Sequence, residues 1–211
     1  MKKLIIVGAG GFGREVAEWA RQNPAYGTYW EIEGFIDDNL NALNGFSSEL
    51  KIIESIKNWQ PGKDHLHVIA IGNTKTKKAI VEGLISKGAK FISLIHPTVI
   101  IASSAEIGIG SVICPFSVIS ANAKIGKYVI INLNCAIGHD AKIEDWCTLS
   151  SFCDVTGKVK IGSGTYMGSH AAVVPKVRVG CDVNIGAGSI VVTNIKDNSR
   201  VFGIPARRLS I

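Results

Sequence analysis

A six-residue repeat of aliphatic side chains fills the second half of the chain and limits its fold more than any other feature. Every sixth residue from Ile107 to Val191, fifteen in a row, is aliphatic or methionine. The series extends back to Ile101 and Ile95 and ends at Asp197. Neither the 3.6-residue period of a helix nor the two-residue alternation of a strand produces such a pattern. A hexapeptide period predicts a parallel β-helix.

A small residue usually follows four positions after each aliphatic one, and both kinds of side chain are expected to point into the core. Three hexapeptides form one triangular coil, so residues three hexapeptides apart should stack, with neighbouring coils at about 4.8 Å. Hexapeptide coils turn left-handed, which is an exception to the usual right-handed crossover. Residues 95–196 keep the repeat without a break and therefore predict an all-β left-handed parallel β-helix of five to six coils.

The first part of the chain follows a different pattern, in which strands alternate with helices. The segments "KLIIVGAG", "YWEIEGFIDD" and "HVIAIGN" are expected as strands, and "GREVAEWARQ" and "TKTKKAIVEGLISKG" as helices. This alternation predicts an α/β domain with a parallel sheet. We therefore expect a small Rossmann-like βαβαβ domain over residues 1–90, the β-helix over 95–196 and a C-terminal tail over 197–211.

Composition narrows the classes of function. The apolar run at the start is too short for a signal peptide, and no run approaches the roughly 18 apolar residues of a membrane helix. Five cysteines, an odd number without the spacing of a secreted framework, indicate reduced thiols and a cytoplasmic protein. The net charge of +6 is spread along the chain, so it suits an anionic small substrate and indicates nucleic acid only weakly.

The stretch "NCAIGHDAKIEDWC", residues 134–147, combines one histidine, three acids and two cysteines. Cys135 and Cys147 occupy the small inward position, as Cys153 does in the next coil. Inward cysteines behave as core side chains, and they cannot converge on a metal ion together with an outward histidine. We therefore expect neither a nucleophilic cysteine nor a metal site in this stretch.

His139 follows the inward Ile137 by two positions, so it is expected to point outward, with Asp140 directly after it. A neighbouring carboxylate can fix the tautomer of a histidine and raise its basicity. His139 is therefore either a solvated surface side chain or a general base. Gly157 follows His139 by three hexapeptides and should lie above it in the next coil. A glycine there leaves space and exposes an N–H that could stabilise an oxyanion in acyl transfer.

A second column of small residues has the same spacing. Ser151, Ser169 and Ala187 are each separated by three hexapeptides, so they should stack in three successive coils. Two interpretations remain open for this column. The small side chains either serve coil packing alone or leave a shallow groove in which an extended thioester arm could lie.

The glycines near the N-terminus form a separate motif. Gly8, Gly10 and Gly13 match G-x-G-x-x-G between a strand and a helix, with Asp37 downstream. This pattern is typical of a NAD site. A domain over residues 1–90 with three strands is half of a dinucleotide fold, however, so a mononucleotide-sized ligand fits better.

Several segments together resemble one family. They are "IIVGAGGFGREVAEW", "GFIDD" and "AIGN" in the first domain and "IGHDAKI", "GAGSIVV" and "VFGIPARRL" later in the chain. The chain resembles the bacterial hexapeptide acyltransferases of the sialic acid O-acetyltransferase and nucleotide-sugar 4-amino N-acetyltransferase family. The resemblance implies an acetyltransferase that moves acetyl from acetyl-CoA to the 4-amino group of a UDP- or dTDP-linked amino-dideoxy sugar for surface glycan synthesis. It also implies a homotrimer with the active site between subunits, where apolar residues such as Trp146 and Tyr166 would lie.

The resemblance also assigns roles to individual residues. His139 matches the general base, Asp140 its carboxylate partner and Gly157 the oxyanion position. Two further sets match binding positions: for acetyl-CoA, Thr148, Ser169, Ala187, Arg207 and Arg208, and for the nucleotide sugar, Gly10, Gly11, Phe12, Asp37, Asp38, Gly72 and Asn73.

Two alternatives remain beside this hypothesis. Acetylation of a sialic acid oxygen is a closely related reaction and would use the same base. A non-catalytic hexapeptide scaffold or binding protein belongs to a different class and would leave His139 without a role.

Overall fold

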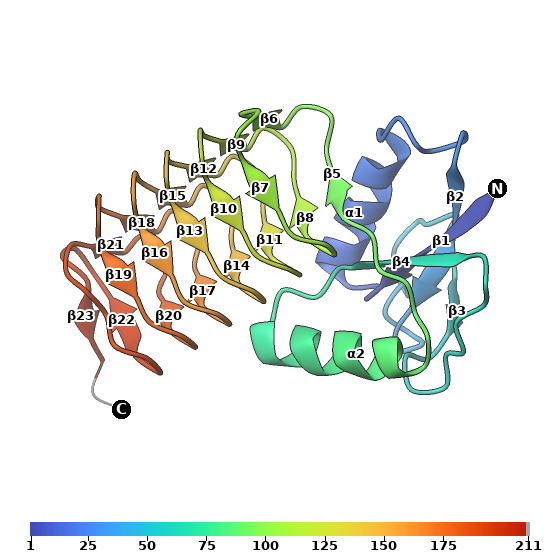
Figure 1. Ribbon diagram of the computed structural model, residues 1–211. Helices are drawn as coiled ribbons and strands as arrows, with labels where there is room; N and C mark the ends of the chain where they lie inside the picture. Colours follow the sequence, from blue (N-terminus) through green and yellow to red (C-terminus); the bar gives the residue numbers. More distant parts are fainter. Residues whose placement is uncertain (210–211) are drawn as a thin grey trace. The chain divides into compact units, whose positions relative to one another are not determined.

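The structure, a computed structural model, describes residues 1–209 of the chain (Figure 1). The chain divides into two compact units, Met1–Pro97 and Thr98 onward. Within the described residues, no helix is long and apolar enough to cross a bilayer. The two expected kinds of fold are confirmed, one in each unit.

The first unit is a parallel four-stranded sheet in the order β3-β2-β1-β4, with two helices. The strands β1, β2 and β4 and both helices coincide with the segments expected from the sequence. The additional edge strand β3 was not predicted, because three residues are too few to show an alternation. The elements are β1 (Lys2–Val7), α1 (Gly11–Arg21), β2 (Trp30–Ile36), β3 (Ile52–Glu54), β4 (His65–Ile69), α2 (Thr74–Ser86) and β5 (Leu94–Ile95).

The central strand β1 is the core of this unit. It reads Leu-Ile-Ile-Val over four fully buried positions, as expected of a strand that has a parallel neighbour on each side. The helix α1 buries Val16, Ala17 and Ala20 along one stripe. The side chain of Asn73 accepts a hydrogen bond from the Thr76 N–H at 2.9 Å and thereby caps α2.

His67 on β4 is a buried polar residue in this core. Its Nε2 accepts a hydrogen bond from Trp59 Nε1 at 3.0 Å, so Nδ1 carries the proton and donates to the Lys90 carbonyl at 3.1 Å. Burial lowers the pKa of His67 from 6.5 to about 4. The imidazole is therefore a neutral structural group.

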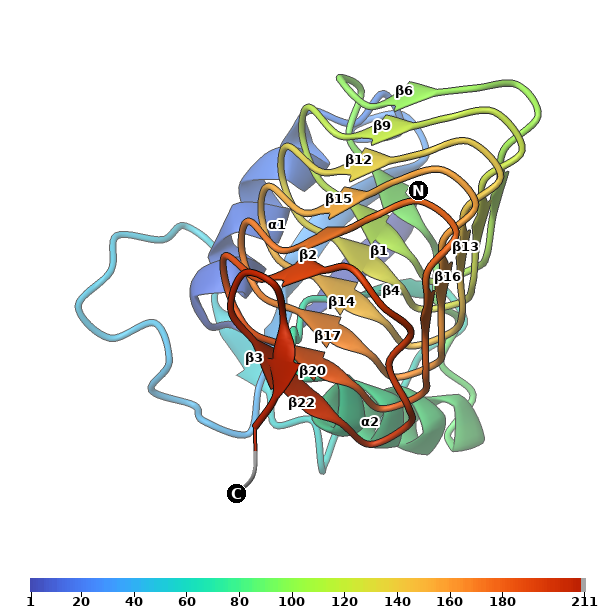
Figure 2. The same ribbon diagram turned by 90° about the vertical axis from the view of Figure 1, so that its left-hand side faces the viewer.

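The second unit is a parallel β-helix in which a short strand lies on each side of a triangular coil (Figure 2). Strands of successive coils pair with partners that lie three hexapeptides apart, such as Ile125 with Ile143. The three faces are named here by their first and last strands. The β6–β21 face contains β6 (Ile100–Ile101), β9 (Val118–Ile119), β12 (Ala136–Ile137), β15 (Asp154–Val155), β18 (Ala172–Val173) and β21 (Ile190–Val191).

The other two faces follow the same spacing. The β7–β19 face contains β7 (Glu106–Ile107), β10 (Lys124–Ile125), β13 (Lys142–Ile143), β16 (Lys160–Ile161) and β19 (Arg178–Val179). The β8–β22 face contains β8 (Val112–Ile113), β11 (Ile130–Ile131), β14 (Thr148–Leu149), β17 (Tyr166–Met167), β20 (Asn184–Ile185) and β22 (Arg200–Phe202).

The small inward residues do more than fill space. Ser117 Oγ donates a hydrogen bond to the Asn132 carbonyl at 2.9 Å and accepts one from the Cys135 N–H at 3.2 Å. Cys153 Sγ donates in the same way to the Gly168 carbonyl at 3.2 Å. These side chains satisfy backbone groups at the corners of the coils. The Gly168 carbonyl also accepts a hydrogen bond from the Ala171 N–H at 3.1 Å.

The corners have a second repeat that the sequence analysis did not identify. From Gly110 to Gly188, every sixth residue has a positive φ, between 52° and 75°. Glycine, asparagine and aspartate adopt this left-handed conformation most readily. Asn122 and Asp140 are two of these corner residues, with φ values of 57° and 60°.

The segment after residue 196, which was expected as a tail, contains two more strands. β22 pairs in parallel with β20, and β23 (Arg207–Arg208) folds back antiparallel onto β22. The hexapeptide pattern ends at Asp197, so it could not predict these strands.

Candidate functional site

His139 and Asp140 form a direct pair at the corner between β12 and β13. His139 Nδ1 lies 2.8 Å from Asp140 Oδ2, and the two side chains are 64% and 39% exposed. Because an ionised carboxylate only accepts hydrogen bonds, Nδ1 carries the proton and the lone pair of a neutral imidazole is on Nε2. Nε2 is the atom that can take a proton from a ligand.

Gly157 lies in the next coil against the imidazole of His139. A β carbon added to Gly157 would lie 2.6 Å from His139 Nε2 and 2.9 Å from Cε1. The space that the sequence analysis expected beside the histidine exists, and the ring itself occupies it. Any other residue at position 157 would displace the ring.

Asp140 has two neighbours from adjacent coils that the sequence analysis did not name. Asn122 Nδ2 donates a hydrogen bond to Asp140 Oδ1 at 3.2 Å. The pKa of Asp140 lies below its ordinary value, first because of the hydrogen bond with His139, then because of Asn122, with smaller effects from the charges of His139 and Lys158. Asn122 and Lys158 lie three hexapeptides before and after Asp140, so the coil spacing could have identified them.

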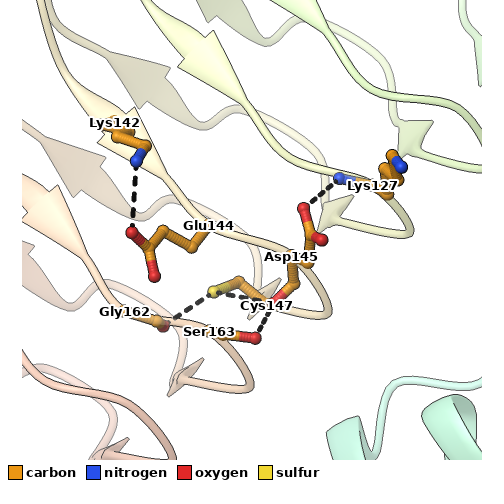
Figure 3. A network of polar contacts seen from close by, with 7 residues as sticks. All are labelled: Lys127, Lys142, Glu144, Asp145, Cys147, Gly162 and Ser163. Carbon is orange, nitrogen blue, oxygen red and sulfur yellow. Dashed lines mark hydrogen bonds and ion pairs between the residues drawn. The ribbon is translucent and has the colours of Figure 1, made fainter.

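The other two acids of the stretch have structural partners (Figure 3). Glu144 Oε1 accepts from Lys142 Nζ at 3.2 Å. The Asp145 carboxylate accepts from the Lys127 N–H at 2.8 Å, and its carbonyl accepts from Ser163 Oγ at 2.8 Å. Of the three acids, Asp140 is the one that pairs with His139.

The residues expected to bind acetyl-CoA lie in three different places of the β-helix. Ser169 and Ala187 are at the corners before β18 and β21, on the edge of the β6–β21 face opposite to the His139 edge. Thr148 on β14 is 4% exposed and lies between its strand partners Ile130 and Tyr166. Within one chain these side chains do not converge on His139.

Arg207 and Arg208 are exposed on β23. They border a small hollow of about 230 Å³ together with Lys196, Asn194 and Ser199. Three cationic side chains around one hollow are suited to bind phosphate groups.

The residues expected to bind the nucleotide sugar come together in the first unit. Gly10, Gly11 and Phe12 follow β1, Asp37 and Asp38 follow β2, and Gly72 and Asn73 follow β4. These strands are adjacent in the sheet and parallel. All seven residues therefore lie at the carboxyl edge of the sheet, the place where open α/β sheets bind ligands.

The glycines of this loop fall into two groups. Gly8 has a left-handed φ of 106°, and a side chain at Gly13 would collide with the Gly8 carbonyl, so both are required by the backbone. A β carbon at Gly10 or Gly11 would meet no atom within 4 Å. These two glycines leave the first turn of α1 uncovered, and its N–H groups there are suited to bind an anion.

The polar residues of this edge also hold the loops in place. Asp37 accepts hydrogen bonds from the Ala9 and Asn39 N–H groups at 2.7 and 2.8 Å. Asp38 accepts one from the Lys57 N–H at 3.0 Å. A separate groove of about 550 Å³ lies along α1, lined by Arg14, Phe46 and their neighbours, and contains none of the seven residues.

Exposed apolar side chains mark the β6–β21 face. Ile100 and Val118 lie on its strands, and Phe116 and Phe152 lie at its edge, with exposures between 37% and 66%. The aromatic residues expected at a subunit contact have partners within the chain. Trp146 stacks on Tyr128 with ring centroids 4.5 Å apart, and the Tyr166 hydroxyl lies 2.9 Å from Ser150 Oγ.

The described part of the chain contains no cluster of three or more histidine, cysteine or acidic residues that could hold a metal ion. The free cysteines Cys114, Cys135, Cys147 and Cys153 are buried, and Cys181 is half-buried.

Comparison with known proteins finds a matching family model, a curated relative and several solved structures. Residues 3–84 match the family model of the PglD N-terminal domain. A UDP-N-acetylbacillosamine N-acetyltransferase of Bacillus subtilis (strain 168) is 34% identical over 119 residues, which are 54% of this chain and 51% of that protein. The match thus spans about half the length of this curated relative.

Solved structures match over the whole chain. The acetyltransferase domain of PglB from Neisseria gonorrhoeae FA1090 is 32% identical with a TM-score of 0.89, covering 99% of this chain and 100% of that one. Its complex with acetyl coenzyme A has a TM-score of 0.87 at 32% identity and covers 99% of both chains. A mutant of perosamine N-acetyltransferase from Caulobacter crescentus, 21% identical with a TM-score of 0.86 over 100% of this chain and 98% of that one, shares the fold.

Proposed function

Since this chain belongs to the bacterial hexapeptide acetyltransferase family that includes PglD and the acetyltransferase domain of PglB, we propose that it acetylates an amino group of a nucleotide-linked sugar. Acetyl-CoA is the donor. The acceptor is the 4-amino group of a UDP- or dTDP-linked amino-dideoxy sugar, and the product serves surface glycan synthesis. The single observation that carries the chemistry is the hydrogen bond between His139 Nδ1 and Asp140 Oδ2.

His139 is the general base in this proposal. With Nδ1–H held by Asp140, Nε2 accepts the proton of the sugar amine as the amine nitrogen attacks the thioester carbonyl carbon. The C–N bond forms, the C–S bond breaks, and the imidazolium returns the proton to the leaving thiolate of CoA. The Gly157 N–H is assigned to the oxyanion of the tetrahedral intermediate.

The binding sites follow from two groups of residues. The nucleotide sugar occupies the carboxyl edge of the first unit, where the open backbone at Gly10 and Gly11 would receive its phosphates. Phe12, Asp37, Asp38, Gly72 and Asn73 surround that edge. For acetyl-CoA we assign the column of Ser169 and Ala187, with Arg207 and Arg208 at the phosphates. Thr148 is assigned to acetyl-CoA by the resemblance alone, since its side chain is 4% exposed.

A homotrimer is part of the proposal, because one chain separates the two halves of the site. His139 lies on one edge of the β6–β21 face, and Ser169 and Ala187 lie on the other. The exposed Ile100, Phe116 and Val118 favour packing of this face against another copy. Such packing would place the His139 of one subunit beside the column of the next. A cytoplasmic location completes the proposal.

The experiment is a transfer assay with acetyl-CoA against UDP- and dTDP-linked 4-amino sugars and free sialic acid, for the wild type and His139→Ala. We expect acetylation of a nucleotide-linked amine and a loss of about 100-fold or more in kcat in the variant. Transfer only to sialic acid would favour the O-acetyltransferase alternative. Absence of transfer to every acceptor, with acetyl-CoA and nucleotide binding intact, would favour a scaffold protein.

A further inference from the structure

The carboxylate of Asp140 is held from two sides. Its Oδ2 pairs with His139 Nδ1 at 2.8 Å, and its Oδ1 accepts a hydrogen bond from Asn122 Nδ2 at 3.2 Å. Because the carboxylate offers acceptors alone, the Asn122 amide must present its nitrogen to Asp140. The three side chains form one chain of hydrogen bonds that ends at the proposed base.

The backbone of the β-helix fixes the position of Asn122. Asn122 is a corner residue with a φ of 57°, and its N–H donates to Ser104 Oγ in the preceding coil at 3.0 Å. Asp140 is the corner residue one coil later, with a φ of 60°, and its N–H donates to the Ala121 carbonyl at 2.9 Å. The stacking of the coils therefore brings the amide of Asn122 under the carboxylate of Asp140.

The pair of His139 and Asp140 needs such support because it is exposed. The side chain of His139 is 64% exposed and that of Asp140 is 39% exposed, so packing alone does not select one rotamer. A second hydrogen bond on Asp140 restricts the rotation of its carboxylate. The groups facing Asp140 are Asn122 from the preceding coil, His139 beside it and the charge of Lys158 from the next coil.

We propose that Asn122 is a positioning residue, which holds the Asp140 carboxylate in the orientation that keeps the proton of His139 on Nδ1 and the lone pair on Nε2. The proposal rests on the proposed function, since it concerns the base of the transfer reaction. Asn122 itself contacts no reacting atom.

The first test removes the amide without straining the corner. Glycine adopts a positive φ freely, so Asn122→Gly deletes the side chain and keeps the backbone. Asn198→Gly is the matched control, because Asn198 is an exposed asparagine with a φ of 55°. We expect kcat to fall about tenfold in Asn122→Gly with both KM values within about twofold, and no change in the control. A kcat within about twofold of the wild type in Asn122→Gly would overturn the proposal.

The second test replaces the hydrogen-bond donor at position 122 with an acceptor. Asn122→Asp keeps the size and the left-handed preference but places a carboxylate, which cannot donate, against Asp140. The added negative charge favours the protonated imidazole, so the acidic limb of the kcat/KM profile should move to higher pH. A residue that merely stabilises the corner would leave this limb in place, and an unmoved limb in Asn122→Asp contradicts the positioning role.

A third measurement keeps the two proposals distinguishable. The imidazole nitrogen chemical shifts of His139 in the ligand-free protein, assigned by comparison with His139→Gln, report its tautomer without any turnover. We expect the Nδ1–H tautomer in the wild type and a mixture in Asn122→Gly. If the wild type transfers acetyl to no acceptor, the proposed function fails. The tautomer measurement still tests whether Asn122 positions Asp140. Identical tautomer populations in the two proteins would refute the role of Asn122.

Discussion

The imidazole of His139 lies directly against the backbone of Gly157, so that a β carbon on Gly157 would be 2.6 Å from His139 Nε2. The two residues are three hexapeptides apart and belong to successive coils. This contact places the proposed base and the proposed oxyanion donor side by side. It also means that the glycine is required by the histidine rather than by its own backbone, because no left-handed φ is found there.

Gly157→Ala should therefore impair transfer by moving the ring of His139. We expect kcat to fall about 10- to 100-fold, since misplacement of a reacting group by about 1 Å costs on this order. The thermal midpoint should change little, because the side chain of His139 is exposed and can rotate away. Gly83→Ala is the control: its β carbon meets no atom within 4 Å, and alanine favours the helix α2. Wild-type kcat in Gly157→Ala would contradict the tight contact.

Asp140→Asn should lower kcat by less than His139→Ala does. In the wild type both neighbours of Asp140 donate hydrogen bonds to it. An asparagine has one acceptor and one donor, so both bonds survive only if the Asn122 amide flips or the imidazole changes tautomer. We expect a loss of about 10- to 100-fold, measured as kcat at saturating acetyl-CoA. A loss equal to that of His139→Ala would mean that Asp140 does more than orient the imidazole.

The pH dependence of activity follows from the same contacts. The pKa of Asp140 is held below its ordinary value of 3.8, first by His139 and then by Asn122. Asp140 is therefore ionised at every pH above about 4. Asp140→Asn removes a negative charge that favours the protonated imidazole, so the acidic limb of the kcat/KM profile should move to lower pH in this variant. An acidic limb that stays in place in Asp140→Asn would contradict the assignment.

Stability of the first unit should fall as the pH is lowered from about 6.5 to 4. The pKa of buried His67 is lowered to about 4, so in this window the unfolded chain binds a proton that the folded unit does not. The contribution of His67 to stability falls by roughly 3 kcal/mol across the window and does not fall further below it. Both helices belong to this unit, so urea unfolding followed at 222 nm measures it. His67→Gln should flatten the pH dependence of the free energy of unfolding. His170→Gln, which replaces an exposed histidine, should leave this dependence unchanged.

The inward thiols should be replaceable by hydroxyls but not by methyl groups. Cys153 Sγ donates to the Gly168 carbonyl at 3.2 Å, the same bond that Ser117 Oγ makes to Asn132. Cys153→Ser keeps this donor, whereas Cys153→Ala leaves the Gly168 carbonyl with the Ala171 N–H alone and should cost about 1 kcal/mol. Denaturant unfolding of the β-helix measures the difference. Equal stability of the two variants would mean that the thiol contributes packing and no stabilising hydrogen bond.

The amino-acid sequence by itself determined the directions of the side chains. The hexapeptide repeat placed Cys135, Cys147 and Cys153 inside and His139 outside, and the structure agrees. A repeat shows whether a side chain points inward or outward, because each position of the repeat recurs at the same place in every coil. The coil spacing also placed Gly157 next to His139, where the structure has it.

Tertiary structure alone decided which polar groups meet. The coil spacing brings Asn122 and Asp140 together, but their hydrogen bond also depends on the rotamers of the two side chains. The loop contacts of Asp37, the capping of α2 by Asn73 and the short strand β3 depend on loop paths, which have no period that a sequence displays. The fold also decided that His139 and Ser169 lie on opposite edges of the β6–β21 face. The two residues are at different corners of the triangular coil, and the structure shows which edge of the face each corner forms.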